Sequence, residues 1–201
     1  MSNPIFELKL ASASPRRRQI LEAANLCFSV LAPAGVEEIH GEVGERFWLE
    51  NARRKALAAA ESGDLEQHVV IGADSVVVCR EKVLGKPSGR DQAREMLEKL
   101  SGSLHRVVTG VSLVLRGEVH CFDESTSVGF HKLSKTEIED YLDTVEPYDK
   151  AGAYGIQGLG SLFVQSFEGS YTNVMGFPLE RFLRELKLFT KIPPSRWMCH
   201  E

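Results

Sequence analysis

The spacing of apolar and polar residues along the chain predicts both helices and strands. Helical spacing predicts helices over residues 15–24, 45–62, 90–100, 134–144 and 179–189. Apolar runs or strict alternation predict strands over residues 28–31, 69–79, 105–115 and 118–130. Residues 161–167 and 170–175 flank Glu168 and Gly169, and we expect them to form a hairpin.

Two of these elements carry a charged residue on an otherwise apolar face. Residues 69–79 form a β-branched run that is typical of a buried central strand, and Asp74 interrupts it. A buried carboxylate needs a partner. The helix over 45–62, with Gly63 as its expected C-cap, has an apolar stripe along which Lys55 lies. Lys55 either reaches solvent at the edge of the stripe or points its ammonium into a cleft.

The start of the first helix has the residues of an anion site. Ser14 suits the N-cap, Pro15 suits the first helical position, and arginines follow. Free N–H groups and the positive end of the helix dipole attract an anion there, most often a phosphate. The alternative is an ordinary capped helix with a solvated basic turn, and Arg18 can pair with Glu22 one turn on.

Two long connections have binding-loop character. Residues 33–45 combine glycines with acidic side chains, and a loop of this length is often functional. Residues 146–158 are too rich in glycine for a regular element, yet they carry an acid, a base, a tyrosine and an amide. The tail over 191–201 holds two prolines and is expected to be an ordered extension or a junction.

Composition limits the classes of partner that the protein is expected to bind. The 201 residues are 43% hydrophobic, with a formal net charge of -4. That balance argues against bulk binding to nucleic acid or to an anionic membrane. The chain contains no apolar run long enough to span a bilayer and no signal-like start, so we expect a cytoplasmic protein. None of the four cysteines forms a C-x-x-C pair, which favours reduced thiols over a disulfide framework or a zinc site.

The unusual residues together suit polyphosphate chemistry. Arginines at a helix start and lysines in cleft-like positions can neutralise phosphate oxygens. Acidic side chains can hold a divalent ion or orient a water. At this level the sequence indicates a phosphate-handling site without naming its substrate.

Five motifs in order, LASASPRRR, VVIGADSVVV, LGKP, DKAGAYGIQG and SYTNVMGFPL, resemble the Maf family of nucleoside triphosphate pyrophosphatases. The resemblance covers the chain from about residue 8 to about residue 188. It implies an α/β fold like that of inosine triphosphatase, with a long mixed, twisted sheet flanked by helices and two lobes around a central cleft. It also implies cleavage between the α and β phosphates, a divalent cation (magnesium or manganese) and a homodimer. We expect one domain over 1–190 and a tail over 191–201.

The resemblance assigns roles residue by residue. It implies phosphate binding by Ser12, Ser14, Arg16 and Arg17. It implies catalysis by Asp74, the proton acceptor, and by Lys55 and Lys86. Glu38 and Asp74 correspond to metal-coordinating acids, and Arg16, Ser75 and Gln157 to positions that select the base. Serine at position 75 departs from the more common threonine but keeps the hydroxyl.

The GIQG stretch resembles the branch that acts on dTTP and UTP. The amide of Gln157 offers a donor and an acceptor together, which suits the O4/N3 edge of thymine or uracil. A second hypothesis is a regulatory module that binds nucleotide without turnover and is linked to cell-division control. The enzyme is favoured because all four charged residues of the site are present, namely Arg16, Lys55, Asp74 and Lys86. An RNA-binding protein is disfavoured by the acidic charge.

Overall fold

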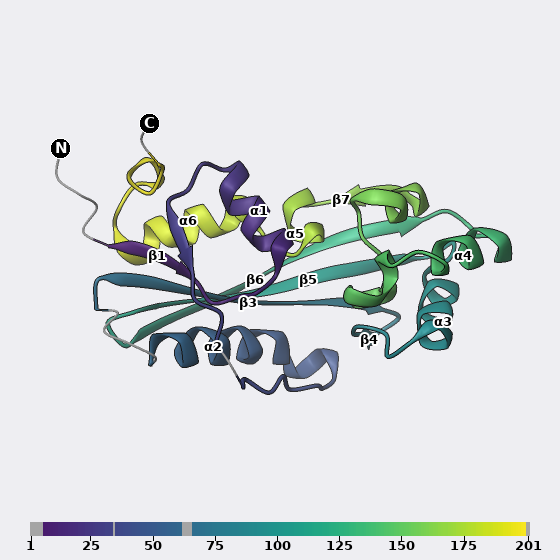
Figure 1. Cartoon of the computed structure of the whole chain (residues 1–201), viewed down its shortest axis with the longest axis horizontal. Helices are drawn as coiled ribbons and strands as arrows, with labels where there is room; N and C mark the ends of the chain where they lie inside the picture. Colours follow the sequence, from purple (N-terminus) through teal and green to yellow (C-terminus); the bar gives the residue numbers. More distant parts are fainter. Residues whose placement is uncertain (1–5, 34, 62–65, 200–201) are drawn as a thin grey trace.

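The computed structural model of the chain describes residues 6–33, 35–61 and 66–199. Its centre is a seven-stranded mixed sheet in which the order β2-β1-β3-β5-β6-β7 forms one path and β4 pairs with β3 (Figure 1). The strands are β1 (Glu7–Leu10), β2 (Phe28–Val30), β3 (His68–Cys79), β4 (Lys82–Leu84), β5 (Leu104–Leu115), β6 (Glu118–Phe130) and β7 (Val164–Glu168). β1 runs parallel to β2 and β3, and the other pairs are antiparallel.

Helices cover both faces of the sheet. They are α1 (Pro15–Ala23), α2 (Phe47–Ala60), α3 (Arg90–Leu100), α4 (Lys135–Leu142), α5 (Tyr171–Met175) and α6 (Leu179–Thr190). α2 lies on one face and α1 and α6 on the other, while α3 and α4 sit near the far ends of the long strands (Figure 1). The mixed α/β fold class expected from the resemblance is therefore present.

Hydrophobic side chains separate into two large buried clusters along the sheet. One packs α1 and α6 onto β1, β3 and β5 and includes Leu8, Leu21 and Phe182. The other joins α3 and α4 to the opposite end of the sheet and includes Leu97 and Leu142. Long strands span both clusters, so the polar middle of β3 lies between two apolar anchors.

Most predicted elements appear within a few residues of their expected bounds. Helix α3 and strand β6 match the predictions fully. Helix α2 begins later than expected, because Arg46 adopts φ 48° and separates the helix from a 3₁₀ turn over Val43–Glu45. The predicted cap Gly63 lies outside the described residues.

The predicted hairpin over 161–175 is wrong. Residues 164–168 form β7, which pairs with β6, and the following segment turns into the short helix α5. Ser170 begins that helix by accepting the Asn173 N–H on its hydroxyl at 3.2 Å. The buried Asn173 amide then donates to Val107 O and Thr126 Oγ1, both at 3.0 Å. These hydrogen bonds stabilise the segment as helix α5.

The expectation of reduced cysteines is wrong for two of the four, while Cys79 and Cys121 are free thiols as expected. Cys27 and Cys199 form a disulfide with their Cα atoms 4.9 Å apart, although 172 positions separate them in sequence. Backbone hydrogen bonds from Cys27 N to Trp197 O and from Cys199 N to Asn25 O bring them together. Trp197 itself is 2% exposed and belongs to the cluster of α1 and α6. The described part of the tail is thus an ordered extension.

Candidate functional site

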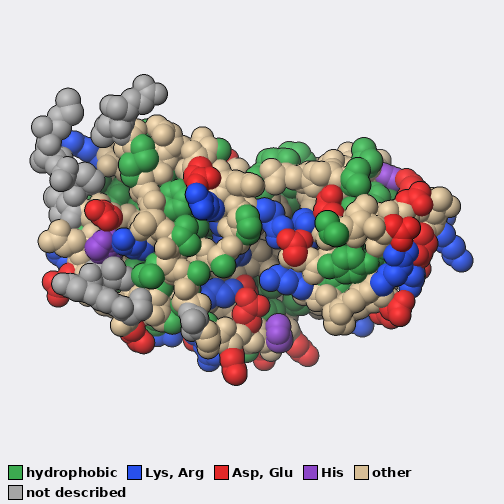
Figure 2. All heavy atoms as spheres, viewed as in Figure 1, with side chains coloured by type: hydrophobic (Ala, Val, Ile, Leu, Met, Phe, Trp, Pro, Cys, Tyr) green, Lys and Arg blue, Asp and Glu red, His purple; other side chains and the backbone are tan. Residues whose placement is uncertain are grey.

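A cavity of about 430 Å³ opens between the two clusters, over the middle of β3. Its walls come from the start of α1, the loop over residues 33–45 (the acidic loop), α2, β3, the turn after β4, the 149–157 segment and the end of α5. Lysine, arginine and acidic side chains gather around the hollow near the centre of the face shown in Figure 2. A second cavity of about 410 Å³ shares Arg16, Lys55 and Lys86 and extends along residues 11–17.

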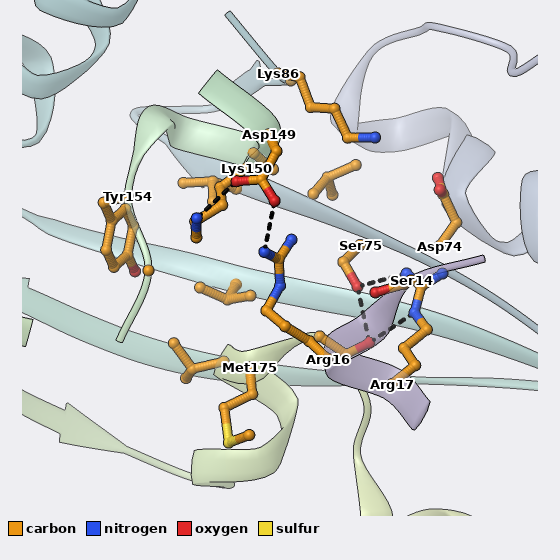
Figure 3. Close-up of a pocket in the computed structure, with 18 of the residues that line it drawn as sticks. Ser14, Arg16, Arg17, Asp74, Ser75, Lys86, Asp149, Lys150, Tyr154 and Met175 are labelled. Atoms are coloured by element: carbon orange, nitrogen blue, oxygen red, sulfur yellow. Dashed lines mark hydrogen bonds and ion pairs between the residues drawn. The ribbon is translucent and has the colours of Figure 1, made fainter. Parts of the chain in front are cut away.

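The start of α1 supplies hydroxyl and guanidinium groups to this cavity. Ser14 is the N-cap in extended backbone, and Pro15 is the first helical residue, as predicted. The Ser14 hydroxyl makes no capping bond and lines both cavities. Arg16 reaches across the cavity and donates to Asp149 Oδ2 at 3.0 Å (Figure 3). Arg18 pairs with Glu22 at 2.7 Å, away from the site, as the sequence indicated.

Arg17 has a different setting from Arg16. Its buried guanidinium donates to four protein acceptors, namely Ser12 Oγ, Ala73 O, Ser75 Oγ and Gly176 O, at 2.8–3.2 Å. Burial lowers the pKa of Arg17, and the charge of Asp74 partly opposes that effect. Since a guanidinium has five N–H donors, Arg17 keeps one for a ligand. Its main structural effect is to tie the start of α1 to β3.

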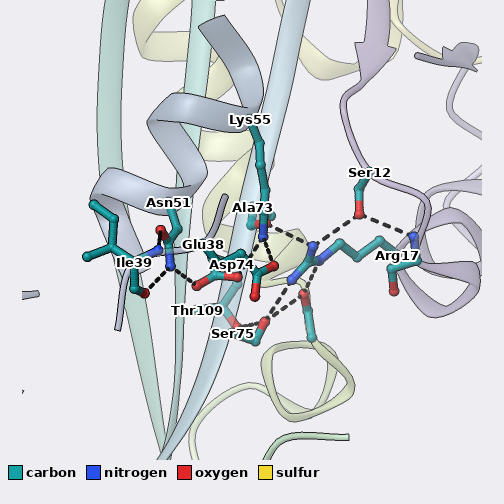
Figure 4. Close-up of polar contacts among 12 residues, drawn as sticks. Ser12, Arg17, Glu38, Ile39, Asn51, Lys55, Ala73, Asp74, Ser75 and Thr109 are labelled. Atoms are coloured by element: carbon teal, nitrogen blue, oxygen red, sulfur yellow. Dashed lines mark hydrogen bonds and ion pairs between the residues drawn. The ribbon is translucent and has the colours of Figure 1, made fainter. Parts of the chain in front are cut away.

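Lys55 and Asp74 meet at the centre of the site. The Lys55 ammonium donates to Asp74 Oδ1 at 2.8 Å and to Glu38 Oε1 at 2.7 Å (Figure 4). The Lys55 side chain is 14% exposed and that of Asp74 is 11% exposed. Of the two outcomes considered for Lys55, the structure therefore shows the ammonium in the cleft. The buried carboxylate of Asp74 has the partner that burial requires.

Glu38 completes a pair of carboxylates. Burial opposes its ionisation, but the hydrogen bond and charge of Lys55 and the charge of Lys86 outweigh it, so the pKa of Glu38 lies below its ordinary value. Magnesium is commonly held by one or two carboxylates plus substrate phosphates. Glu38 and Asp74 fit that pattern. Across residues 6–33, 35–61 and 66–199, no cluster of three or more Asp, Glu, His or Cys side chains could hold a metal.

Apolar side chains also line the cavity. They include Val76, Val107, Ile156, Val174 and Met175. Two predicted specificity residues line the same cavity. Gln157 is exposed at the lining, whereas the Ser75 hydroxyl is bonded to Thr109 Oγ1, Gly176 O and Arg17. Ser75 therefore acts on the cavity mainly by fixing its neighbours.

Lys86 faces the same space from the turn after β4. It is exposed and lines both cavities. The preceding Gly85 carbonyl accepts the Gly152 N–H at 3.0 Å, which joins this turn to the 149–157 segment. The structure thus places every predicted site residue at one of the two overlapping cavities, with Ser12 lining the second.

The sequence interpretation marked residues 146–158 as a binding loop but gave no role to Asp149 or Tyr154 within it, and it missed Asn51. Asp149 accepts from Arg16 and, on its other oxygen, from Lys150 at 2.6 Å. Burial opposes ionisation of Asp149, but those two cations outweigh it and hold its pKa below the ordinary value. Tyr154 lines the cavity and bonds His105. Asn51 bonds Asp74 Oδ2 at 3.1 Å, and its position four residues before Lys55 on one helix was the available signal.

The fold and site define an α/β protein whose cleft is lined by basic, acidic and apolar side chains. Residues 7–189 match the family described as Maf-like protein, and this chain belongs to that family. It is 44% identical over 182 residues to proteins named dTTP/UTP pyrophosphatase from Bacillus cereus (strain ATCC 14579) and Bacillus anthracis. Each alignment covers 90% of this chain and 94% of the relative.

Two solved structures are similar at low identity. One is a nucleoside-triphosphatase, dITP/XTP pyrophosphatase, from Mycobacterium abscessus, with a TM-score of 0.45, 14% identity and coverage of 92% of this chain and 97% of that chain. The other is the Ham1 protein of Staphylococcus aureus, with a TM-score of 0.43, 20% identity and coverage of 62% and 71%. Among the described residues, every helix is too short or too polar to cross a membrane.

Proposed function

We propose that this protein is a nucleoside triphosphate pyrophosphatase that converts dTTP and UTP to the monophosphate and pyrophosphate. The observation that carries the proposal is one cavity lined by Arg16, Lys86 and the Lys55–Asp74 pair together with apolar side chains and Gln157. The names of the relatives at 44% identity support it. A regulatory module without turnover would not need a carboxylate and an ammonium held together at the centre of the site.

The phosphate chain lies, in this proposal, between the start of α1 and Lys86. Arg16, Lys86 and the hydroxyls of Ser12 and Ser14 bind its oxygens, together with the free N–H groups of the first turn of α1. Arg17 positions this segment and offers its remaining N–H group. Because Arg16 bonds Asp149, phosphate oxygens replace that carboxylate as the partner of Arg16 when the nucleotide binds.

The chemistry is hydrolysis at the α phosphorus. Asp74 accepts a proton from water, the water oxygen bonds to the α phosphorus, and the bond from that phosphorus to the α–β bridging oxygen breaks. Lys55 orients Asp74 and neutralises charge that develops on the phosphates. Glu38 and Asp74 would hold a divalent cation, which supplies further neutralisation of the phosphate oxygens. The homodimer that the resemblance implies and the cytoplasmic location that the sequence favours stay predictions.

The base lies, in this proposal, against the apolar walls of the cavity, next to Gln157. Thymine and uracil share an O4 acceptor beside an N3–H donor, whereas cytosine presents the reverse pair. A site that bonds one edge leaves groups unpaired with the other, a loss of about 1–3 kcal/mol per group. We therefore expect dTTP and UTP to be preferred over CTP and the purine triphosphates by roughly tenfold or more.

A kinetic panel tests the proposal. We would measure kcat/KM for dTTP, UTP, CTP, ATP, GTP and 7-methyl-GTP and separate the products by anion exchange. Gln157→Ala should flatten the preference for UTP over CTP, while Gln165→Ala, at an exposed glutamine on β7, should leave it unchanged. Asp74→Asn sets the background rate. A parent protein that prefers GTP or 7-methyl-GTP would contradict the assignment of the base.

A further inference from the structure

Asn51 is a buried amide that lies just behind the cavity. It occupies the first half of α2, is 2% exposed and does not line either cavity. Its Oδ1 accepts the Ile39 N–H at 2.8 Å, and its Nδ2 donates to Ile39 O at 2.9 Å and to Asp74 Oδ2 at 3.1 Å (Figure 4). Both protons of the amide group are thus used, and its orientation is fixed by the acceptors.

The two bonds to Ile39 fix the backbone next to Glu38. Within the loop over 33–45, residues 35–42 belong to no strand or helix, so no regular element fixes their backbone. The paired bonds from one amide hold the Ile39 peptide at both its donor and its acceptor. Glu38 is the adjacent residue, and its carboxylate reaches Lys55 at 2.7 Å. Asn51 therefore determines where Glu38 enters the site.

The third bond fixes the other carboxylate. Lys55 holds Asp74 Oδ1, and Asn51 holds Oδ2, so donors on both oxygens set the plane of the Asp74 carboxylate. The two donors lie four residues apart on α2, on one face of the helix. One rigid element thus determines the position of Asp74 from two sides.

We propose that Asn51 is a positioning residue for hydrolysis, which sets Glu38 and Asp74 relative to each other through a single amide. This inference rests on the proposed function. The competing explanation is that Asn51 only fastens the acidic loop to α2. Both explanations predict a loss of stability when Asn51 is replaced, but only a positioning role predicts a selective loss of kcat.

The test compares Asn51→Ala and Asn51→Asp with a control on the same helix. Asn51→Asp keeps the shape and can still accept the Ile39 N–H, but it cannot donate to Ile39 O or Asp74. Trp48→Phe removes one hydrogen bond from α2 to a carboxylate, Trp48 Nε1 to Asp123 Oδ2 at 3.0 Å, outside the site. For each variant we would measure the thermal midpoint, kcat and KM with UTP, and the Kd for UMP by calorimetry.

We expect kcat to fall about ten- to hundredfold in both Asn51 variants, because a hydrogen bond to a charged group is lost. The Kd for UMP should change less than threefold, since Asn51 lines neither cavity. Trp48→Phe should lower the midpoint without lowering kcat. If Asn51→Ala does not fold, the isosteric Asn51→Asp decides the question.

Two results would overturn the inference. In the first, the parent is active and the kcat of each Asn51 variant lies within twofold of that of Trp48→Phe. The proposed function then stands and only the positioning role fails. In the second, kcat and UMP binding fall by the same factor, which indicates general disruption. A parent that releases no pyrophosphate from any triphosphate would instead remove the proposed function, and this inference with it.

Discussion

At the scale of single residues, the site depends on a few charged side chains that pair with each other. Lys55 bonds two carboxylates, and Arg16 bonds a third. The sequence marked Lys55 and Asp74 because each is out of place on an apolar face. It could not show that they are partners, since that contact joins a helix to a strand 19 positions away.

Replacing Lys55 by methionine tests this pairing. The apolar stripe alone would predict that Lys55→Met folds as well as the parent. The ion pairs reverse that expectation, because Asp74 is left buried without its cation. We expect the free energy of unfolding to fall by about 1.5–3 kcal/mol and turnover to be largely lost.

Arg54→Met is the matched control for Lys55→Met. Arg54 is the neighbouring residue, about half exposed, and pairs only with Glu50 in the contacts described. Its replacement should change stability by less than about 0.5 kcal/mol. Urea unfolding and a rate assay give both quantities. Unchanged stability and activity in Lys55→Met would show that its ion pairs contribute nothing.

At the scale of elements, the site depends on how closely α2 approaches the sheet. A Cβ on Gly72 of β3 would collide with the Ala52 carbonyl and lie 2.8 Å from Ala56 N. A Cβ on Gly110 of β5 would lie 2.8 Å from Trp48 O. The sequence predicted the helix and both strands. The glycines alone could not show how the two strands are aligned with each other. Only the pairing of β3 with β5 places both under α2.

Gly72→Ala should therefore separate the helix from the strand that carries Asp74. We expect a loss of about 1–3 kcal/mol in stability and a lower kcat, because Asn51 and Lys55 move away from Asp74. Gly89→Ala is the control, since nothing lies within 4 Å of its added Cβ. A Gly72→Ala protein with normal stability and rate would contradict the close-packing argument.

At the scale of the whole molecule, two buried clusters hold the halves of the cleft. The sequence predicted most of the elements in them from periodicity. It missed the disulfide, the docking of Trp197 and the short helix α5, because all three depend on contacts between segments far apart in the chain. The candidate site was found from residue types and motifs, whereas its internal hydrogen bonds required the fold.

A buried titrating group, His105, lies against the cluster of α3 and α4. His105 bonds Tyr154 OH through Nε2 at 2.7 Å and packs edge-on against Phe130. Burial lowers the pKa of His105 from 6.5 to about 4. As the pH falls from 6.5 toward 4, the unfolded chain takes up a proton at this residue before the folded protein does. Stability should fall across that window by up to about 3 kcal/mol.

Urea unfolding at several pH values between 4 and 7.5 measures this effect, because that range includes the folded and the unfolded pKa of His105. His105→Gln keeps a partner for Tyr154 but does not titrate, so its stability should vary less with pH than that of the parent. Equal pH dependence in the two proteins would show that His105 does not contribute.

In the proposed reaction, water attacks the α phosphorus of a pyrimidine triphosphate and pyrophosphate leaves. Hydrolysis of UTP in ¹⁸O-labelled water, followed by mass spectrometry of the products, tests this step. We expect label in UMP and none in pyrophosphate. Label in pyrophosphate, or orthophosphate as the first product, would contradict it.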